Sequence, residues 1–237
     1  MLPFFLSITR HNIFVNNGKK DISIIGAGIS GLTLGIILKI YNIPCTIFEK
    51  YNSVSEYGAG ISISPNGLEV LKSLNIYDDL LKISAQPLST NFHSNLKKIV
   101  KVPTDVLTAS RKSLYKVLYD KYLSLNGTIL FDHELIDINF DKNILYFSNK
   151  KTYEFNHIAA CDGIKSSCNN ISLGQIEKPI YSGYSVWRSI LNSNQKDINF
   201  YLGPNYHIVT YPIDKKRCSF VAVVKNQLEN NESWKQK

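Results

Sequence analysis

With 237 residues, 44% of them hydrophobic and 19% charged, the chain has the length and composition of a globular protein with a substantial core, which excludes a disordered chain. Its formal net charge of +8 comes from scattered lysines that cluster only as isolated Lys-Lys pairs. A solvated lysine-rich surface is therefore favoured over a nucleic-acid interface, and an anionic cofactor or substrate fits the same charge.

Residues 1–20 are expected to form an N-terminal extension. They begin with an apolar run but lack the basic region and the small-residue cleavage site of a secretory leader. No later segment has the apolar length of a membrane span. The four cysteines form no CxxC motif and the histidines show no metal-ligand spacing beside them, so we expect reduced thiols, no metal site and a cytoplasmic protein.

A glycine-rich turn follows the first predicted strand, residues 21–25, and leads into a helical run over 32–41. Gly26 permits the tight turn from strand to helix, Gly28 lets the backbone approach a pyrophosphate, and Gly31 lets the helix pack closely on the sheet. This pattern predicts a dinucleotide site.

The start of this helix, with Ile29 and Ser30, is expected to turn unpaired N–H groups and the positive end of the helix dipole toward the phosphates. Glu49 ends the next apolar run, 23 residues after Gly26, where its carboxylate can accept hydrogen bonds from both ribose hydroxyls. The same carboxylate would repel a 2′-phosphate. These residues do not distinguish FAD from NAD.

Beyond Glu49 the sequence predicts two further helices and two groups of strands. Pro65 in a first turn favours a helix over 65–74, and an apolar stripe that stops at Asn126-Gly127 favours a helix over 111–125. The first group of strands is expected to form a meander over 128–131, 134–140, 143–148 and 152–155, followed by an apolar run at 158–161 and the turn Asp162-Gly163. The second group shows alternating apolar and polar residues and is rich in aromatic residues. Its strands are expected over 183–191, 198–202, 206–213 and 217–224.

This order of elements predicts an α/β fold with two domains. Residues 21–180 are expected to form a Rossmann-like nucleotide-binding domain with a parallel sheet and a β-meander. Residues 181–226 are expected to form a second, mostly antiparallel sheet that contributes to substrate binding, and residues 227–237 form a polar tail.

In their order and spacing the motifs resemble those of the FAD-dependent aromatic-ring monooxygenases of the p-hydroxybenzoate and salicylate hydroxylase type, over about residues 20–234. Several of the motifs are weak evidence when taken singly, and the resemblance depends on their order and spacing along the chain. They are the glycines from Gly26, Glu49-Lys50, Tyr57-Gly58-Ala59-Gly60-Ile61 with Pro65-Asn66, Arg111 with Leu114 and Leu118, Cys161-Asp162-Gly163-Ile164-Lys165-Ser166, Tyr184-Ser185-Val186-Trp187-Arg188, and Gly203-Pro204 through His207 to Tyr211-Pro212.

The resemblance implies that FAD occupies the first site and that NADH or NADPH reduces it. It also implies FAD contacts from Lys50, Gly60, Arg111, Asp162 and Gly163. From the residues alone, Arg111 can equally be a surface residue at a helix start, and Asp162 can be the cap of an ordinary strand-to-helix turn. No catalytic role is expected for the thiol of Cys161, which stands where the family usually has a small residue.

His207 and Tyr211 are the candidate catalytic residues. They lie four residues apart on a predicted strand, so alternation places both on one face. Group members that hydroxylate phenols need the phenol deprotonated, for which a histidine is the natural base, and a tyrosine hydroxyl can orient the substrate. Hydrogen-bonded core residues would give the same pattern. For Arg188, contact with substrate, with flavin or with the domain interface all stay open.

The activity implied by the resemblance is NAD(P)H-dependent hydroxylation of a small aromatic acid or phenol by O2, through a flavin hydroperoxide. Family members carry a later glycine-aspartate motif without a counterpart before Lys237, so we expect an FAD-binding domain that is incomplete at its C-terminus. One alternative is a non-catalytic FAD-binding fragment or one half of a split enzyme. Another is an epoxidase or quinone-precursor hydroxylase of the same fold. A homodimer and a complementing C-terminal chain are the partners left open.

Overall fold

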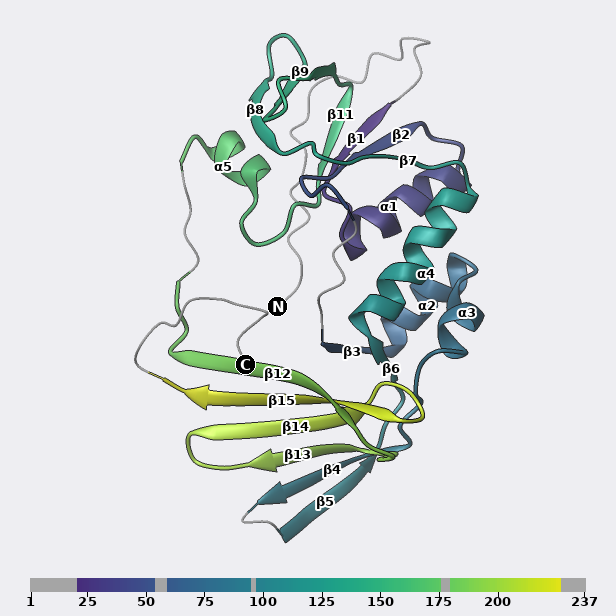
Figure 1. Cartoon of the computed structure of the whole chain (residues 1–237), viewed down its shortest axis with the longest axis vertical. Coiled ribbons are helices and arrows are strands. Elements are labelled where there is room, and N and C mark those ends of the chain that lie inside the picture. Colours follow the sequence, from purple (N-terminus) through teal and green to yellow (C-terminus); the bar gives the residue numbers. More distant parts are fainter. Residues whose placement is uncertain (1–20, 54–58, 95–96, 176–179, 227–237) are drawn as a thin grey trace.

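The computed structural model describes residues 21–53, 59–94, 97–175 and 180–226 (Figure 1). The predicted N-terminal extension, the polar tail 227–237, and Tyr57 and Gly58 of the family motif lie outside these residues. Within them, a four-stranded parallel sheet with its helices, a small meander and a two-stranded pair accompany a six-stranded sheet.

The parallel sheet holds the glycine-rich turn and has the strand order β11-β1-β2-β7. Its centre is a β-α-β unit that confirms the first predicted elements, with α1 beginning three residues before the predicted helical run. The elements are β1 (Ile22–Ile25), α1 (Ile29–Ile40) and β2 (Cys45–Phe48), flanked by β11 (His157–Ala160) and β7 (Thr128–Leu130).

Alternating residues of β1 and β2 enter two separate cores. Ile24 and Ile47 are fully buried against α1 and α4 (Arg111–Ser124), together with residues of α2 (Pro65–Ser73) and α3 (Tyr77–Leu81). Ile25 and Phe48 face the other side, where they pack with the meander and α5 (Ser167–Leu173). Figure 1 shows this layering, with α1 and α4 on one side of the sheet and β8, β9 and α5 on the other.

The second sheet has the order β12-β15-β14-β13-β4-β5. Its first three pairs are antiparallel, and β13 then pairs in parallel with β4. The strands are β12 (Tyr184–Asn192), β13 (Ile198–Leu202), β14 (Tyr206–Pro212), β15 (Arg217–Lys225), β4 (Ser89–Ser94) and β5 (Lys97–Pro103). The structure therefore confirms a mostly antiparallel second sheet. It adds β4 and β5, which the sequence analysis missed and which carry the sheet across the predicted boundary at residue 180.

The prediction that residues 128–131 belong to the meander is wrong. β7 pairs in parallel with β2, with Ile129 opposite Ile47, so it is an edge strand of the parallel sheet. The meander has three strands: β8 (Leu135–Asn139), β9 (Ile144–Phe147) and β10 (Thr152–Glu154). Neither α3 nor α5 was predicted from the sequence, nor was the antiparallel pair of β3 (Gly60–Ile63) and β6 (Leu107–Ser110).

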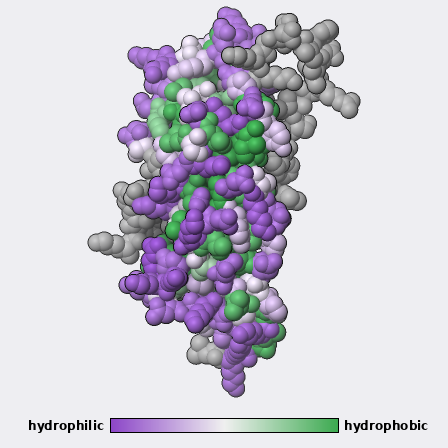
Figure 2. Space-filling view, turned by 90° about the vertical axis from the view of Figure 1, so that its right-hand side faces the viewer, coloured by the Kyte–Doolittle hydropathy of each residue, from purple (hydrophilic) through white to green (hydrophobic). Residues whose placement is uncertain are grey.

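Hydrophilic residues cover much of the side that carries the helices, with hydrophobic residues between them (Figure 2). Exposed lysines pair with carboxylates one helical turn away, as in Lys72–Glu69 and Lys116–Asp120, both at 2.7 Å. This distribution agrees with a solvated surface. None of the helices in the described segments is long and apolar enough to cross a membrane.

Candidate functional site

Three loops meet at the carboxyl edge of the parallel sheet, because β11, β1 and β2 are neighbours that end at the same edge. The N–H of Gly26 donates to the carbonyl of Phe48, and the N–H of Cys161 donates to the carbonyl of Ile25, both at 2.8 Å. These bonds continue the strand ladder into the loops. The edge thus brings together most of the predicted cofactor-binding residues: Gly26, Gly28, Ile29, Ser30, Gly31, Glu49, Lys50, Asp162 and Gly163.

The three glycines of the turn have different surroundings. Gly26 has a φ of +103°, and a Cβ there would lie 2.5 Å from the carbonyl oxygen of Cys161. A Cβ on Gly31 would lie 1.9 Å from the carbonyl oxygen of Gly26, so glycine is what lets α1 approach the turn. A Cβ on Gly28 would have no described atom within 4 Å. The backbone at Gly28 is therefore open to a ligand.

No described side chain caps the N-terminus of α1. Gly28 is the N-cap, and its carbonyl accepts the first hydrogen bond of the helix from the N–H of Leu32 at 2.9 Å. The N–H groups of Ile29, Ser30 and Gly31 precede that first donor, and the first turn holds no acidic residue. Together with the positive end of the helix dipole, such N–H groups form a binding site for an anion.

Glu49 lies beside this helix start. Its Oε2 accepts a hydrogen bond from the N–H of Ala27 at 2.7 Å, and its Oε1 accepts one from the N–H of Tyr51 at 3.1 Å. Each carboxylate oxygen keeps a further acceptor position. Glu49 can therefore hold the turn and still accept a hydrogen bond from a ligand hydroxyl. Lys50 is exposed, with its Nζ 5.2 Å from the centre of the Tyr51 ring.

The first half of α4 borders the same carboxylate. Burial, and secondly the negative charge of Glu49, raise the pKa of Tyr115 to about 12. Tyr115 also stacks on Tyr119, with ring centres 6.1 Å apart. Arg111 is the first residue of α4, one turn before Tyr115, and its side chain is exposed.

Asp162 and Gly163 form the turn from β11 into α5. The Asp162 carboxylate accepts hydrogen bonds from the Ser166 hydroxyl at 2.7 Å and the N–H of Cys168 at 3.0 Å, and Gly163 has a φ of +81°. The Ser166 hydroxyl in turn accepts from the N–H of Asn169 at 2.9 Å. Asp162 thus helps to hold the start of α5, the structural role that the sequence left open. An FAD contact from Asp162 or Gly163 stays a prediction.

The four cysteines are free thiols. Burial raises the pKa of the Cys161 thiol to about 11, with a smaller contribution from the charge of Asp162, and burial likewise raises the pKa values of Cys45 and Cys168. These shifts agree with the expectation that Cys161 is not a nucleophile.

We expect native Cys161 to react with iodoacetamide at pH 8 at least about tenfold more slowly than the same cysteine in the urea-unfolded chain, because the reactive thiolate is scarce at a raised pKa. Timed alkylation followed by peptide mass spectrometry measures the two rates. Equal rates would contradict a partly buried, unreactive thiol.

Gly60 and Arg111 lie at the pair of β3 and β6. The N–H of Arg111 donates to the carbonyl of Ala59 at 2.9 Å, which joins the start of α4 to the start of β3. Both polar backbone groups of Gly60 are bonded to the second sheet. Its N–H donates to Ser219 Oγ at 3.3 Å, and its carbonyl accepts from Arg188 Nη2 at 2.7 Å. FAD contacts from Gly60 and Arg111 stay predictions, whereas Arg188 clearly lies at the junction of β3 with the second sheet.

His207 and Tyr211 lie on one face of β14, as their spacing requires. Tyr211 is buried, and its hydroxyl accepts a hydrogen bond from Arg188 Nη2 at 3.4 Å. His207 is half-buried and lies opposite Val223 of β15. Four residues of strand separate the two by about 13 Å. They therefore border different parts of this face, and their catalytic roles stay a prediction.

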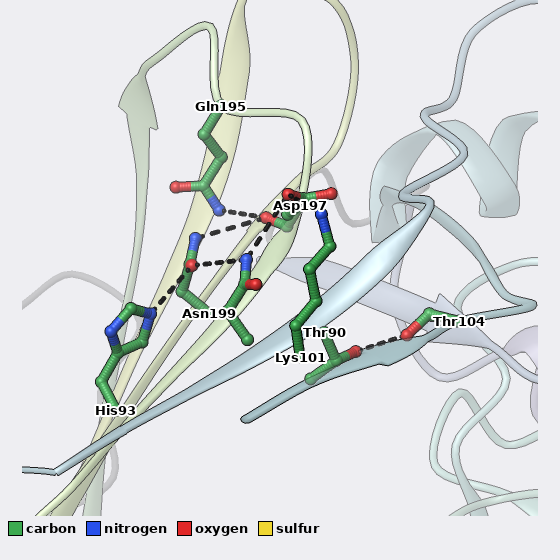
Figure 3. A network of polar contacts seen from close by, with 8 residues as sticks. Thr90, His93, Lys101, Thr104, Gln195, Asp197 and Asn199 are labelled. Carbon is green, nitrogen blue, oxygen red and sulfur yellow. Dashed lines mark hydrogen bonds and ion pairs between the residues drawn. The ribbon is translucent and has the colours of Figure 1, made fainter. Parts of the chain in front are cut away.

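A polar network that the sequence analysis missed joins β4, β5 and β13 (Figure 3). Asn199 Oδ1 accepts from Asn91 Nδ2 at 3.2 Å and lies 3.3 Å from His93 Nε2, while Lys101 Nζ is 3.9 Å from Asp197. By strand alternation this network lies on the face opposite to the one that carries Tyr211. Its contacts tie the β4–β5 hairpin to β13.

A family model described as an FAD binding domain matches residues 19–229. The chain belongs to the FAD-binding domain family. Its residues fit the cofactor: the backbone at Gly28 is open, the first N–H groups of α1 are uncapped by described side chains, and Glu49 has acceptor positions to spare.

Curated relatives of this FAD-binding domain are monooxygenases. It is 26% identical over 211 residues to 3-amino-4-hydroxybenzoate 2-monooxygenase of Streptomyces cremeus, which covers 81% of the chain and 53% of the relative. It is 22% identical over 242 residues to 6-hydroxynicotinate 3-monooxygenase of Bordetella bronchiseptica, which covers 92% of the chain and 62% of the relative. The chain therefore spans less than two thirds of the length of these relatives.

Solved structures share the fold. A tetrameric form of 2-methyl-3-hydroxypyridine-5-carboxylic acid oxygenase superposes with a TM-score of 0.78 at 21% identity, over 87% of this chain and 59% of that one. Klebsiella pneumoniae HpxO complexed with FAD and uric acid superposes with a TM-score of 0.80 at 19% identity, over 93% of this chain and 60% of that one. These matches confirm the predicted fold class.

Proposed function

We propose that this chain forms the cofactor- and substrate-binding part of an FAD-dependent, NAD(P)H-using monooxygenase that hydroxylates a small aromatic acid or phenol. The observation that carries the proposal is the open backbone at Gly28, at an uncapped helix start beside Glu49. The names of the two relatives above, both monooxygenases of hydroxylated aromatic acids, support the substrate class.

In this proposal the N–H groups of Ile29 and Ser30 bind the diphosphate, and Glu49 accepts hydrogen bonds from the ribose hydroxyls. Lys50 and Arg111 are exposed cations that can pair with phosphate oxygens. When bound, FAD would supply the redox chemistry: it would accept a hydride from NADH or NADPH and then activate O2. The protein itself has to orient FAD and the aromatic substrate and keep water away from them.

The face of the second sheet that carries His207 and Tyr211 is proposed to hold the aromatic ring. Phe200, Val209 and Val221 lie on this face and pack against the buried Tyr211 cluster, which suits an apolar ring. His207 would accept the phenol proton, and Tyr211 would orient the ring through its hydroxyl. The proton acceptor matters because a phenolate ring is more readily oxygenated than the phenol.

We expect Glu49→Gln to weaken FAD binding by the isolated chain about tenfold, since hydrogen bonds to a charged acceptor contribute about 1.5–3 kcal/mol. Gln keeps one acceptor oxygen for the N–H of Ala27 and loses only the longer, exposed bond from the N–H of Tyr51, so the fold should persist. Quenching of flavin fluorescence during titration measures the affinity.

Glu69→Gln is the matched control, because Glu69 is an exposed carboxylate on α2 that pairs with Lys72. Its FAD affinity should stay within about twofold of the unchanged chain, as exposed pairs contribute little. A chain that binds no FAD at micromolar concentration, alone or with a complementing C-terminal chain, would overturn the proposal.

The second candidate is a non-catalytic FAD-binding fragment or one half of a split enzyme. FAD binding without substrate-stimulated NAD(P)H oxidation by the chain alone would support this alternative. Turnover restored by a complementing C-terminal chain would support the split enzyme. A cytoplasmic location and a homodimer are part of the main proposal, that of an FAD-dependent monooxygenase.

A further inference from the structure

Gly60 joins the two-stranded β3–β6 pair to the six-stranded second sheet. It begins β3, whose pairing with β6 leaves the N–H and C=O groups of Gly60 on the side away from β6. Both groups bond to side chains of the second sheet, Ser219 of β15 and Arg188 of β12. Neither backbone group of Gly60 is left without a protein partner.

The contact is so close that it requires glycine. A Cβ at position 60 would lie 2.6 Å from Ser219 Cβ, 2.7 Å from Tyr211 Cε2 and 2.8 Å from Ile213 Cγ2. Ser219 is fully buried and Tyr211 nearly so, so these neighbours have little room to move. The position of β3 relative to the second sheet is therefore well defined at this point.

Arg188 makes the only charged contact in this junction among the described residues. Its Nη2 donates to Gly60 O at 2.7 Å and to the Tyr211 hydroxyl at 3.4 Å, so one guanidinium connects β3 with β14. Hydrogen bonds from a charged donor are stronger than neutral ones. No carboxylate in the described part of the chain pairs with Arg188, which leaves Gly60 and Tyr211 as its bonded partners there.

The junction continues from Gly60 to Arg111. Ala59, the preceding residue, accepts the hydrogen bond from the N–H of Arg111 at 2.9 Å, and Gly60 lies opposite Ser110 in the β3–β6 pair. A displacement of Gly60 would therefore move the start of α4. This helix start carries the exposed Arg111 side chain that the proposed function assigns to FAD.

We propose that Arg188 is a positioning residue: through Gly60 it fixes β3 and the start of α4, and so Arg111, relative to the face of the second sheet that carries Tyr211. This proposal rests on the proposed function for the role of Arg111 in FAD binding. The junction itself stands on the contacts of Gly60 and can be tested without any cofactor.

The test compares Arg188→Met, Arg188→Lys and Arg217→Met in the 237-residue chain. Arg217 is the matched control, because it lies on the same sheet and its guanidinium pairs with Asp214 at 2.7 Å and makes no described hydrogen bond to Gly60. Amide hydrogen exchange by NMR is measured at Gly60 and Arg111, with Ile24 in β1 as the probe of the overall fold. FAD affinity is measured on the same samples by fluorescence titration.

We expect Arg188→Met to speed exchange at Gly60 and Arg111 at least about tenfold and to weaken FAD binding about three- to tenfold. Arg188→Lys should recover part of both effects, since an ammonium can still donate to Gly60 O. Arg217→Met should change neither by more than about twofold. If Arg188→Met also speeds exchange at Ile24, the variant has disturbed the overall fold. Ser219→Ala then provides a milder test, because it removes only the acceptor of the Gly60 N–H. Faster exchange at Gly60 and Arg111 and weaker FAD binding are again expected.

Equal exchange rates at Gly60 in Arg188→Met and Arg217→Met would show that Arg188 does not hold Gly60 and would overturn the proposal. Faster exchange with unchanged FAD affinity would overturn the positioning role toward Arg111. If the unchanged chain binds no FAD, the proposed function fails, whereas the exchange rates still decide whether Arg188 holds Gly60.

Discussion

A Gly31→Ala variant is expected to be less stable than the unchanged chain by about 3 kcal/mol or more, the upper range for overpacking. Alanine is the better helix former by about 1 kcal/mol, which by itself would stabilise α1. The clash is the larger effect, because the added Cβ would lie 1.9 Å from the carbonyl oxygen of Gly26, a backbone atom held in the turn. Thermal unfolding measures the change, with an expected decrease in Tm of about 6–12 °C.

Gly67→Ala is the control for this prediction. Gly67 also lies inside a helix, α2, but the one described atom that its added Cβ would meet is Ile63 Cγ2, at 2.9 Å. A side chain can adjust where a backbone carbonyl cannot, so we expect a change within about 1 kcal/mol. Similar Tm values for the two variants would show that α1 does not depend on glycine at its contact with the turn.

The β-α-β unit and its turn were predictable because the signals are local. Gly26, Gly28 and Gly31 act within six residues of one another, and strand, turn and helix follow without a gap. The position of Glu49 beside the turn was predictable because parallel neighbours end at the same edge. Its bond to the N–H of Ala27 was not predicted, since a carboxylate expected to face a ligand gives no sign of also holding the turn.

The strands that the sequence analysis missed or misplaced pair with distant partners. β4 has few apolar residues and pairs with β13, in a contact that joins residues more than 100 positions apart. β7 has the spacing of a meander strand, and its parallel pairing with β2 spans a long connection that includes α2, α3 and α4, which the residues of β7 do not reveal. Register with a remote strand is a property of the assembled sheet, which a single segment does not reveal.

Gly60 illustrates the same limit within the candidate site. The family resemblance indicates an FAD contact, and the residue types around it contain no sign that Ser219 and Arg188 bond its backbone. Ser219 is an ordinary strand residue in the sequence, 159 positions from Gly60. Only the packing of β3 against β12 and β15 gives these two side chains a shared partner.

Gly28→Val is expected to fold but to bind FAD about 100-fold more weakly. The added Cβ meets no described atom within 4 Å, so we expect the fold to lose mainly the preference for glycine over valine at an N-cap, about 1 kcal/mol. The isopropyl group would instead fill the space through which a diphosphate reaches the N–H groups of Ile29 and Ser30. The loss of one or two hydrogen bonds to a charged acceptor, at about 1.5–3 kcal/mol each, gives the stated decrease in affinity.

Ser64→Val separates this steric effect from any general effect on a helix start. Ser64 is the N-cap of α2, with φ −76° and ψ 164° against −71° and −175° at Gly28, and neither residue makes a side-chain cap bond to a helix N–H. The Ser64 hydroxyl donates to Asn66 Oδ1 at 2.5 Å, so valine disturbs the start of α2 at least as much as it disturbs the start of α1. Only Gly28 lies at the carboxyl edge of the parallel sheet. Fluorescence titration should give an unchanged FAD affinity for Ser64→Val. An unchanged affinity for Gly28→Val as well would place the diphosphate elsewhere, because a ligand at the start of α1 has to pass within contact distance of the residue at position 28.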